Sequence, residues 1–344
     1  MKSNKKIIFL YAVLEPYIIG SLEYFVNSNK DFDITVIKTD NRIYRSKNHN
    51  LNIYSITEIQ DLLKFCVSIK PQILIVSGRM EKSYLKVSKY YRNKIKTVMV
   101  SDGTFDLSLK GLFKILFQKS LYHKFFNFYW GVGSLQTAHA LSLGFRKDKI
   151  FENFYTSAIE HNEPKITFNE KKSLRILSVA RLDKEKNLQL TARTIESINN
   201  KYNYDIQFNI IGDGPLKKQL QNYKCVNLHG RKEQSEFYQF ASENDIFCLP
   251  SSSEPWGVVL HEFTNLGMPI LASYNCGSAF NLVIDGYNGY KFKYDNQIDF
   301  EDKIIKFIEL TNSEKKIMSK NSITISKRFS NSFWAETLKE IYYR

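Results

Sequence analysis

The chain has 344 residues, of which 43% are hydrophobic and 24% are charged, and its formal net charge at pH 7 is +14. This balance is typical of a globular protein, and the length suits two domains of ordinary size. No apolar run reaches the ~18 residues of a membrane-spanning helix. The four cysteines lie singly, which excludes a disulfide framework or a cysteine metal cluster and suits the reducing cytoplasm.

The positive charge is concentrated in the first half of the chain. Residues 1–160 contain 24 Lys and Arg against 13 Asp and Glu, whereas residues 161–344 contain 25 against 22. A basic half indicates an acidic partner such as nucleic acid, phospholipid or a phosphorylated substrate. A solvated lysine-rich surface explains the same charge equally well.

The first predicted element is a buried strand over residues 7–13. Its surroundings are basic and then apolar, as in a signal peptide, but Glu15 and Pro16 follow where a cleavage site would need small residues. Further apolar runs predict strands, and the amphipathic stretches between them, such as 55–70, predict helices. The other strands predicted in the first half are 33–38, 73–78, 97–103 and 126–133.

The same alternation returns in the second half, after a polar stretch that predicts a linker. Apolar strands that alternate with helices, such as 187–202, indicate parallel sheets covered on both faces. We therefore predict an α/β protein with two doubly wound sheets, whose strand ends meet at one ligand cleft. The strands predicted in the second half are 174–180, 206–212, 226–230, 245–251 and 269–273.

Two loops of the second half carry residues suited to phosphate binding. Arg181 and Lys186 lie in the loop between a strand and a helix. The arginine can bind two oxygens of a diphosphate at once and the lysine supplies a compact positive charge, so the pair suits a diphosphate. A pair of surface cations explains them as well. The turn IIGDGPL lets Gly212 approach a ligand closely, but it lacks the third glycine of the dinucleotide-binding fingerprint.

The stretch SSSEPWGVVLHEF, residues 251–263, contains two glutamates with seven residues between them. A turn ends at Gly257 and a helix is predicted over 258–266, so the first amides of this helix would be free to bind an anion. Glu262 would then accept hydrogen bonds from a ribose, and Glu254 would meet a sugar. The spacing therefore suits a nucleotide-sugar, although each glutamate alone is equally an exposed helix residue or a turn residue.

In combination, ARLDKEKN, IIGDGPL, the stretch from NLHG to PILAS, and GYNGYKF resemble the retaining glycosyltransferases of family 4, whose hallmark is E-x7-E. The resemblance covers about residues 174–310. It implies a GT-B fold: two Rossmann-like domains with the active site between them and a final helix that returns to the first domain. The expected parts are an acceptor-side domain 1–160, a linker 161–173, a donor-binding domain 174–328 and a returning helix 329–344.

The resemblance also implies roles for individual residues. Arg181 and Lys186 would bind the donor diphosphate, and backbone groups near Gly230 would recognise the base. The family usually needs no metal ion, so neither a metal nor a cofactor is expected beside the nucleotide-sugar. The expected catalytic residues are Glu254, Arg181, Lys186 and Asp102. The expected donor-binding residues are Gly20, Arg181, Lys186, Gly212, Gly230, Arg231, Glu254, Gly257, Val258, Val259 and Glu262.

The first half departs from the family pattern at two places. Members often carry paired glycines in the first loop, where GSLE, residues 20–23, stands here. Gly20 would bring its amide to the diphosphate, while Ser21 replaces a glycine. Many members also carry a histidine near the acceptor, at about the place of Asp102. This aspartate would take that role, or else begin a helix as a turn residue.

Residues 109–126 predict a basic amphipathic helix. Such a helix can lie on an anionic membrane, where bacterial family members meet lipid-linked acceptors, or it can cover a sheet as a core helix. Its predicted apolar side consists of Leu112, Phe113, Leu116, Phe117 and Leu121, and its polar side of Lys110, Lys114, Gln118 and Lys119.

We therefore predict an enzyme that transfers a hexosyl or N-acetylhexosaminyl group, with retention, from a nucleotide-sugar. The donor is by default a UDP-sugar, and the acceptor is a glycan or lipid-linked glycan of a bacterial capsule or lipopolysaccharide. No carboxylate stands as an obvious nucleophile, which favours a front-face mechanism in which the leaving diphosphate deprotonates the acceptor. The expected location is the cytoplasm or the inner face of its membrane.

Two alternatives remain. One is another GT-B enzyme, such as a nucleotide-sugar epimerase, and the other is a protein that binds nucleic acid or another anionic polymer through its basic half. Neither alternative explains the joint set of Arg181, Lys186 and the two glutamates, so no nucleic-acid partner is expected.

Overall fold

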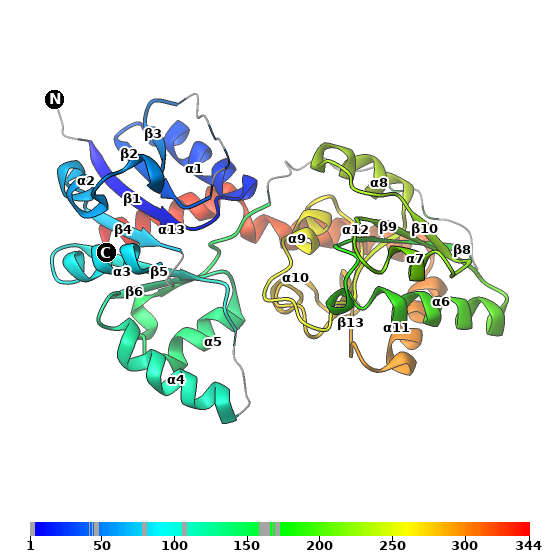
Figure 1. Ribbon diagram of the computed structural model, residues 1–344. Helices are drawn as coiled ribbons and strands as arrows, with labels where there is room; N and C mark the ends of the chain where they lie inside the picture. The colour runs from blue at the N-terminus through cyan, green and yellow to red at the C-terminus, as the bar shows by residue number, and fades with distance from the viewer. Residues whose placement is uncertain are drawn as a thin grey trace. The chain divides into compact units, whose positions relative to one another are not determined.

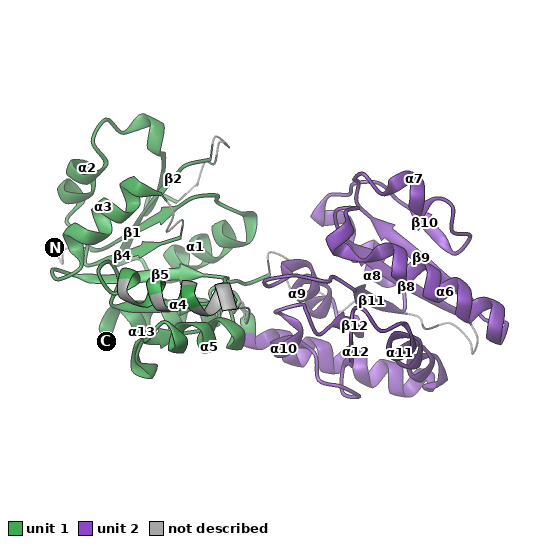
Figure 2. Ribbon diagram, turned by 60° about the horizontal axis from the view of Figure 1, so that its bottom comes forward, with its two compact units in different colours: residues 1–158, 329–344 green, residues 159–328 purple. Residues whose placement is uncertain are grey.

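The computed structural model describes residues 4–40, 42, 44, 48–77, 81–104, 109–157, 166, 168 and 173–344, without the side chains of 109–112, 114, 116 and 120. Most of the predicted linker 161–173 therefore lies outside the described residues. The chain forms two compact units (Figure 2). Unit 1 comprises Met1–Ala158 and Phe329–Arg344, and unit 2 comprises Ile159–Arg328.

Unit 1 is built on a parallel sheet with the strand order β3-β2-β1-β4-β5-β6-β7 (Figure 1). The first strand of the chain therefore lies inside the sheet, and the strand order reverses beside it. The strands are β1 (Lys5–Tyr11), β2 (Phe32–Lys38), β3 (Leu51–Ser55), β4 (Ile73–Val76), β5 (Lys96–Ser101), β6 (Phe128–Gly131) and β7 (Ile150–Phe151). The helices are α1 (Pro16–Ser28), α2 (Leu62–Ile69), α3 (Lys82–Tyr91), α4 (Leu109–Tyr122), α5 (Ser134–Ser142) and α13 (Asn331–Tyr343).

Both faces of this sheet are covered, which is why its strands read as continuous apolar runs. Successive side chains of a strand point to opposite faces. Ile7 and Phe9 of β1 pack with α1 and α13, whereas Ile8 and Leu10 pack with the layer formed by α2, α3, α4 and α5.

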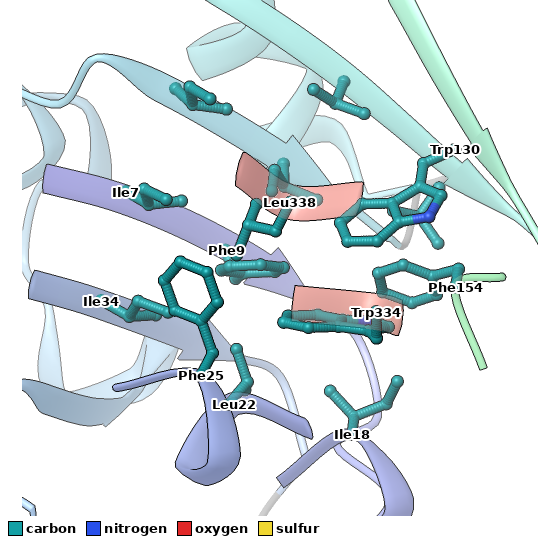
Figure 3. Close-up of a cluster of buried hydrophobic side chains, with 14 of the residues drawn as sticks. Ile7, Phe9, Ile18, Leu22, Phe25, Ile34, Trp130, Phe154, Trp334 and Leu338 are labelled. Carbon is teal, nitrogen blue, oxygen red and sulfur yellow. The ribbon is translucent and has the colours of Figure 1, made fainter. Parts of the chain in front are cut away.

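The last helix of the chain, α13, completes the core of unit 1, as predicted. Trp334 is fully buried and lies 5.1 Å from the ring of Trp130 and 6.2 Å from that of Phe9, measured between ring centroids. Figure 3 shows Trp334 and Leu338 among side chains of the first strands and α1. The last residues of the sequence, 329–344, thus belong to the same unit as β1, which begins at residue 5.

Unit 2 contains a second parallel sheet, in the order β10-β9-β8-β11-β12-β13. Its strands are β8 (Ser173–Val179), β9 (Asp205–Ile211), β10 (Val226–Leu228), β11 (Ile246–Leu249), β12 (Ile270–Ser273) and β13 (Gly289–Phe292). Its helices are α6 (Leu188–Tyr202), α7 (Lys217–Leu220), α8 (Phe237–Glu243), α9 (Val258–Asn265), α10 (Ala279–Leu282), α11 (Gln297–Glu309) and α12 (Asn312–Ser326). The two sheets confirm the predicted α/β class with two doubly wound domains.

Three strands that the sequence did not predict join these sheets: β3, β7 and β13. The helix predicted over 55–70 also divides into a short 3-10 turn and α2. Asp61 causes this break, because its side chain accepts a hydrogen bond from the backbone N–H of Lys64 at 3.1 Å and caps α2.

Gly20 requires a correction. The sequence placed it in the first loop, but α1 already begins at Pro16, and Gly20 is the fifth residue of the helix. A proline at the first helical position is preset for the helix. The amide of Gly20 therefore belongs to the interior of a helix, and it is not a loop amide that could approach a diphosphate.

The neighbouring Ser21 has a structural role. Its fully buried hydroxyl contacts Thr156 Oγ1 at 2.8 Å and donates to Asn331 Oδ1 at 3.0 Å. Thr156 lies just before the chain leaves unit 1, and Asn331 lies just after it returns. One side chain of α1 thus contacts both the segment that leaves unit 1 and the segment that returns to it.

Candidate functional site

The strand order of unit 2 reverses at β8, which has β9 on one side and β11 on the other. Loops that leave the carboxyl ends of two such strands run in opposite directions and leave a crevice, where ligands of these sheets bind. The loops after β8 and β11 are held together here, because the N–H of Ser252 donates to the carbonyl oxygen of Glu185 at 2.8 Å. Residues that are distant in sequence thus meet at one place.

Lys186 and Glu254 form an ion pair across these two loops. Lys186 Nζ lies 2.6 Å from Glu254 Oε2, and the two side chains are only 14% and 17% exposed. Lys186 ends a 3-10 turn that precedes α6. The structure therefore brings together the predicted diphosphate cation and the predicted sugar carboxylate, as partners of each other.

Arg181 lies in the same loop as Lys186 but extends outward. Its side chain is 77% exposed and pairs with Asp183 at 3.2 Å. The structure thus places Arg181 beside the site without a contact to Glu254. Because the guanidinium is on a flexible, exposed side chain, its predicted contact with a diphosphate stays a prediction.

The N-terminus of α9 faces the same strand end. Gly257 takes the N-cap position with a φ of 88°, a conformation that favours glycine, and a Cβ there would lie 2.9 Å from the side chain of Leu249. Within the described part of the chain, the amides of Gly257, Val258 and Val259 donate to no acceptor. These amides at a helix N-terminus can bind an anion.

Glu262 lies in the second turn of α9 and is only 7% exposed. Burial raises the pKa of its carboxyl to about 7, although a hydrogen bond from the Gln234 amide to Glu262 Oε1 acts in the opposite direction. A buried carboxyl with one polar partner is costly unless further donors are supplied. The structure therefore rules out an ordinary exposed helix residue and leaves a carboxyl that can accept hydrogen bonds from a ligand.

The glycines of the IIGDGPL turn have a different explanation from the predicted one. A Cβ on Gly212 would lie 1.8 Å from the carbonyl oxygen of Ala180, so glycine is needed there to let two loops of unit 2 touch. Gly212 also donates to the carbonyl oxygen of Gly230 at 2.8 Å. The predicted contacts of Gly212, Gly230 and the exposed Arg231 with the donor rest on the resemblance alone.

Sequence reasoning missed a loop that supports the turn around Glu254. Residues 275–278 follow β12, and the N–H of Gly277 donates to the carbonyl oxygen of Glu254 at 2.9 Å. A Cβ on Gly277 would lie 2.0 Å from the carbonyl oxygen of Pro255. The only sequence signal for this loop is a glycine after a predicted strand. Gln234 carried no signal, because its partner Glu262 is 28 residues away.

Asp102 lies in unit 1, directly after β5. Its Oδ2 accepts a hydrogen bond from the Tyr155 hydroxyl at 3.3 Å, and its carbonyl oxygen accepts one from Gln136 at 2.9 Å. The carboxylate thus contacts a tyrosine and not the N-terminus of a described helix. Its predicted role near an acceptor stays a prediction.

Two general properties of the chain concern metals and membranes. The described His, Cys, Asp and Glu side chains form no group of three or more that is placed to hold a metal ion. Among the same residues, no helix combines the length and apolarity required to cross a bilayer. Independence of a metal ion stays a prediction.

Comparison with known proteins agrees with the geometry of unit 2. Residues 159–324 match the family model described as glycosyl transferases group 1. An uncharacterised glycosyltransferase of Methanocaldococcus jannaschii is 35% identical over 134 residues, which are 37% of this chain and 37% of that protein. The amylovoran biosynthesis glycosyltransferase AmsK of Erwinia amylovora is 34% identical over 117 residues, 30% of this chain and 28% of that protein. The chain thus spans about a third of the length of these relatives.

A solved structure extends the likeness to both units. The structure of Anabaena HepE in complex with UDP and glucose covers 98% of this chain, and this chain covers 99% of it, with a TM-score of 0.71 at 14% identity. A likeness at this identity shows the fold, and it confirms the predicted GT-B class. The sequence likeness to the glycosyl transferases group 1 family covers residues 159–324, just under half of the chain.

Proposed function

We propose that the protein is a retaining glycosyltransferase that moves a sugar from a UDP-sugar to a glycan or lipid-linked glycan of a bacterial surface polysaccharide. The family match supports glycosyl transfer. One relative is named for amylovoran biosynthesis, which supports a polysaccharide acceptor, and HepE was solved with UDP and glucose, which supports a UDP-sugar donor. The proposed transferred group is a hexosyl or N-acetylhexosaminyl group, and the proposed reaction requires no metal ion.

The observation that carries the proposal is the Lys186–Glu254 pair beside the N-terminus of α9. A diphosphate bound at the free amides of Val258 and Val259 would give Lys186 an anionic partner and release Glu254 toward the sugar. Glu262, one turn further along α9, would accept hydrogen bonds from the ribose. The three groups thus fit the three parts of one nucleotide-sugar.

The same groups explain how the chemistry would proceed. When the bond between sugar and diphosphate breaks, negative charge grows on the leaving oxygen. Lys186 and the α9 amides stabilise that charge, and stabilisation of charge that develops in the transition state is a large term in catalysis. Arg181 adds a second cation from the edge of the site. The leaving phosphate then takes the proton of the attacking acceptor hydroxyl, on the same face of the sugar.

We also propose that unit 1 meets the acceptor at an anionic membrane surface. Phe113 and Phe117, one turn apart on α4, are 73% and 70% exposed, and Lys119 is an exposed cation elsewhere on the same helix. Exposed aromatic side chains on a helix that also carries cations are typical of helices that lie at a membrane interface. The side chains of Lys110, Lys114, Leu112 and Leu116 lie outside the described residues.

A thermal-shift experiment tests the donor site. UDP, GDP and ADP are added separately to the protein, and the melting temperature is measured. A ligand present at 100 times its dissociation constant stabilises the folded state by about 2.7 kcal/mol, so UDP should raise the melting temperature by several degrees. Lys186→Ala should lose most of this increase.

Lys201→Ala is the matched control for Lys186→Ala. Lys201 pairs with Glu301 at 3.0 Å on the surface of the same unit, with its side chain 58% exposed. This variant should respond to UDP as the parent does. If none of the three nucleotides raises the melting temperature of the parent, or if both lysine variants respond alike, the proposed donor site is wrong.

A further inference from the structure

Unit 1 has a switch point of its own. Its strand order reverses between β1 and β4, so ligands are expected at the carboxyl ends of these strands. Tyr11 ends β1, Ser77 follows β4, and Asp102 follows the next strand, β5. Three polar side chains therefore stand in a row at the edge where a ligand of unit 1 would bind.

Tyr155 joins this row from another part of the chain. Its hydroxyl donates to Asp102 Oδ2 at 3.3 Å, and its ring packs edge-on against Tyr17 with the centroids 5.0 Å apart. Burial raises the pKa of both Tyr155 and Tyr11 well above the ordinary value, and side-chain hydrogen bonding with Ser77 and Tyr155 only partly offsets this for Tyr11. The tyrosines therefore stay protonated at neutral pH and act as hydrogen-bond donors.

The backbone on either side of Tyr155 is anchored. Phe154 is fully buried in the core, and its N–H donates to the carbonyl oxygen of Gly131 at 3.1 Å. Thr156 is held by the buried hydroxyl of Ser21. A side chain between two such anchors has little freedom, so its hydroxyl is fixed relative to the sheet.

The carboxylate of Asp102 is only partly satisfied by this contact. Within the described residues it forms no ion pair, and its Oδ1 accepts no hydrogen bond. Asp102 is half-buried, so one carboxylate oxygen is held while the other is accessible. A carboxylate oxygen held by a tyrosine hydroxyl, at a sheet edge that also carries Tyr11 and Ser77, is suited to a neutral polyhydroxylated ligand, because each hydroxyl of a sugar both donates and accepts.

We propose that Tyr155 is a positioning residue for the acceptor: it holds Asp102 Oδ2, so that Oδ1 accepts a hydrogen bond from a hydroxyl of the acceptor sugar. This rests on the proposed glycosyl transfer and adds to it a residue that sets acceptor binding. Asp102 orients the acceptor hydroxyl and takes no proton from it. Tyr155 acts only through Asp102.

The test compares two reactions of the same enzyme. UDP-glucose, GDP-glucose and ADP-glucose are supplied as donors, and a panel of p-nitrophenyl hexosides is supplied as acceptors. Hydrolysis of the donor in the absence of an acceptor reports on unit 2, whereas transfer to a hexoside also requires unit 1. Tyr155→Phe deletes one hydroxyl. It should lower kcat/KM for transfer by about 10- to 100-fold, mostly through the KM of the acceptor, and leave donor hydrolysis within about twofold of the parent.

A double-mutant cycle shows whether Tyr155 acts through its partner. In the background of Asp102→Asn, the change Tyr155→Phe should have almost no further effect on transfer, because coupled residues are not additive. Tyr91→Phe is the matched control, since Tyr91 is buried against the opposite face of the same sheet. It should leave the acceptor KM unchanged.

Each outcome decides one point. Normal transfer by Tyr155→Phe, additive effects with Asp102→Asn, or an equal loss of hydrolysis and transfer would overturn the role of Tyr155. A parent protein that hydrolyses none of the three donors and transfers none of them to any hexoside would contradict the proposed function itself, and the role of Tyr155 with it.

Discussion

Glu262 shows how much a single side chain depends on its surroundings. Its carboxyl is buried in α9 with one amide partner, and its pKa is raised to about 7. In the unfolded chain an ordinary glutamate titrates near 4.3. The folded state therefore binds this proton more tightly than the unfolded state does, and Glu262 favours folding only while it is protonated.

This linkage predicts a pH dependence of stability. The contribution of Glu262 is complete below pH 4.3 and is lost as the pH rises through about 7, because the carboxylate must then be buried. The loss amounts to about 4 kcal/mol when the difference between 4.3 and about 7 is converted at 1.36 kcal/mol per pKa unit. Glu262→Gln cannot ionise and should lack this dependence. Urea unfolding of both proteins at pH 5 and pH 7.5 measures the difference.

The matched control for this experiment is Glu309→Gln at the end of α11, whose carboxyl is exposed. Its pH dependence should follow that of the parent. If the curves of the parent and Glu262→Gln run parallel, the carboxyl of Glu262 is not buried as described. A ribose bound at Glu262 would favour the carboxylate, so UDP should protect the parent more at pH 7.5 than at pH 5.

At the scale of elements, the loops after β8 and β9 pack backbone against backbone. Gly212 permits this contact, since any side chain there would collide with Ala180. The contact keeps the loop that carries Arg181 and Lys186 close to the sheet. The glycine turn at Gly212 therefore influences the candidate site indirectly, because it sets the position of the loop that carries Arg181 and Lys186.

Gly212→Ala should be strongly destabilising for this reason. Its Cβ would lie 1.8 Å from the oxygen of Ala180. Overpacking alone costs about 1–3 kcal/mol, and the backbone at a φ of +143° adds strain for any residue other than glycine. Urea unfolding should show a loss of about 3 kcal/mol or more.

Gly230→Ala separates the collision from the backbone strain. Gly230 has a φ of +69°, but no atom lies within 4 Å of a Cβ built on it. This variant should lose only about 1–2 kcal/mol, the usual penalty of a left-handed conformation. Equal losses in the two variants would show that the packing of the two loops is not the reason for Gly212.

For the molecule as a whole, the positive charge and the exposed aromatic side chains of unit 1 favour binding to an anionic membrane. Residues 1–160 contain 24 Lys and Arg against 13 Asp and Glu. Phe113 and Phe117 on α4 are among the most exposed large apolar side chains of the described residues. A basic surface with protruding aromatics binds anionic membranes by two additive terms, one sensitive to salt and one apolar.

Vesicle flotation tests this proposal. The parent should float with vesicles of phosphatidylcholine and phosphatidylglycerol at low salt, and less at high salt. Replacing Phe113 and Phe117 by Ser should weaken binding by about 10- to 100-fold, since part of the burial energy of two aromatic side chains is lost. Replacing Lys110, Lys114 and Lys119 by Gln should weaken it by about 1–3 kcal/mol, at roughly 1 kcal/mol per basic residue.

Ile298→Ser is the control for the aromatic variant, because Ile298 on α11 is a single side chain that is 81% exposed in the other unit. It should float as the parent does. Equal flotation of the parent, the aromatic variant and the lysine variant would refute contact between α4 and the membrane, and it would leave the proposed donor site untouched.

Elements whose information is local were predictable from the amino-acid sequence. The apolar runs of β1, β4 and β11 are continuous, since both faces of each strand are buried, and such a run is recognisable within a few residues. The helix start at Val258 was also predictable, because Gly257 ends the turn just before it. The family motifs of the second half, read as a set, pointed to the same fold that the structure and the comparisons show.

Other elements could not be predicted because their stability comes from partners. Strand β7 has two residues, and β13 has four with mixed burial. Neither has a pattern of its own, and each exists because a neighbouring strand supplies hydrogen-bond partners. Gly20 was placed in a loop because GSLE matches the position of a loop motif in the family. The amide of Gly20 is not free, however, because α1 already begins at Pro16.

The side-chain contacts at the candidate sites depend on the folded arrangement of residues that are distant in the sequence. Lys186 pairs with a residue 68 positions away, Glu262 with one 28 away, and Asp102 with one 53 away. Lys186 and Glu254 meet because they follow β8 and β11, which are neighbours in the sheet. Gln234 and Tyr155 follow β10 and β7, which are not neighbours of the strands that precede their partners. Burial follows from the same packing, and burial turns Glu262 from an ordinary surface carboxylate into a group that titrates near neutral pH.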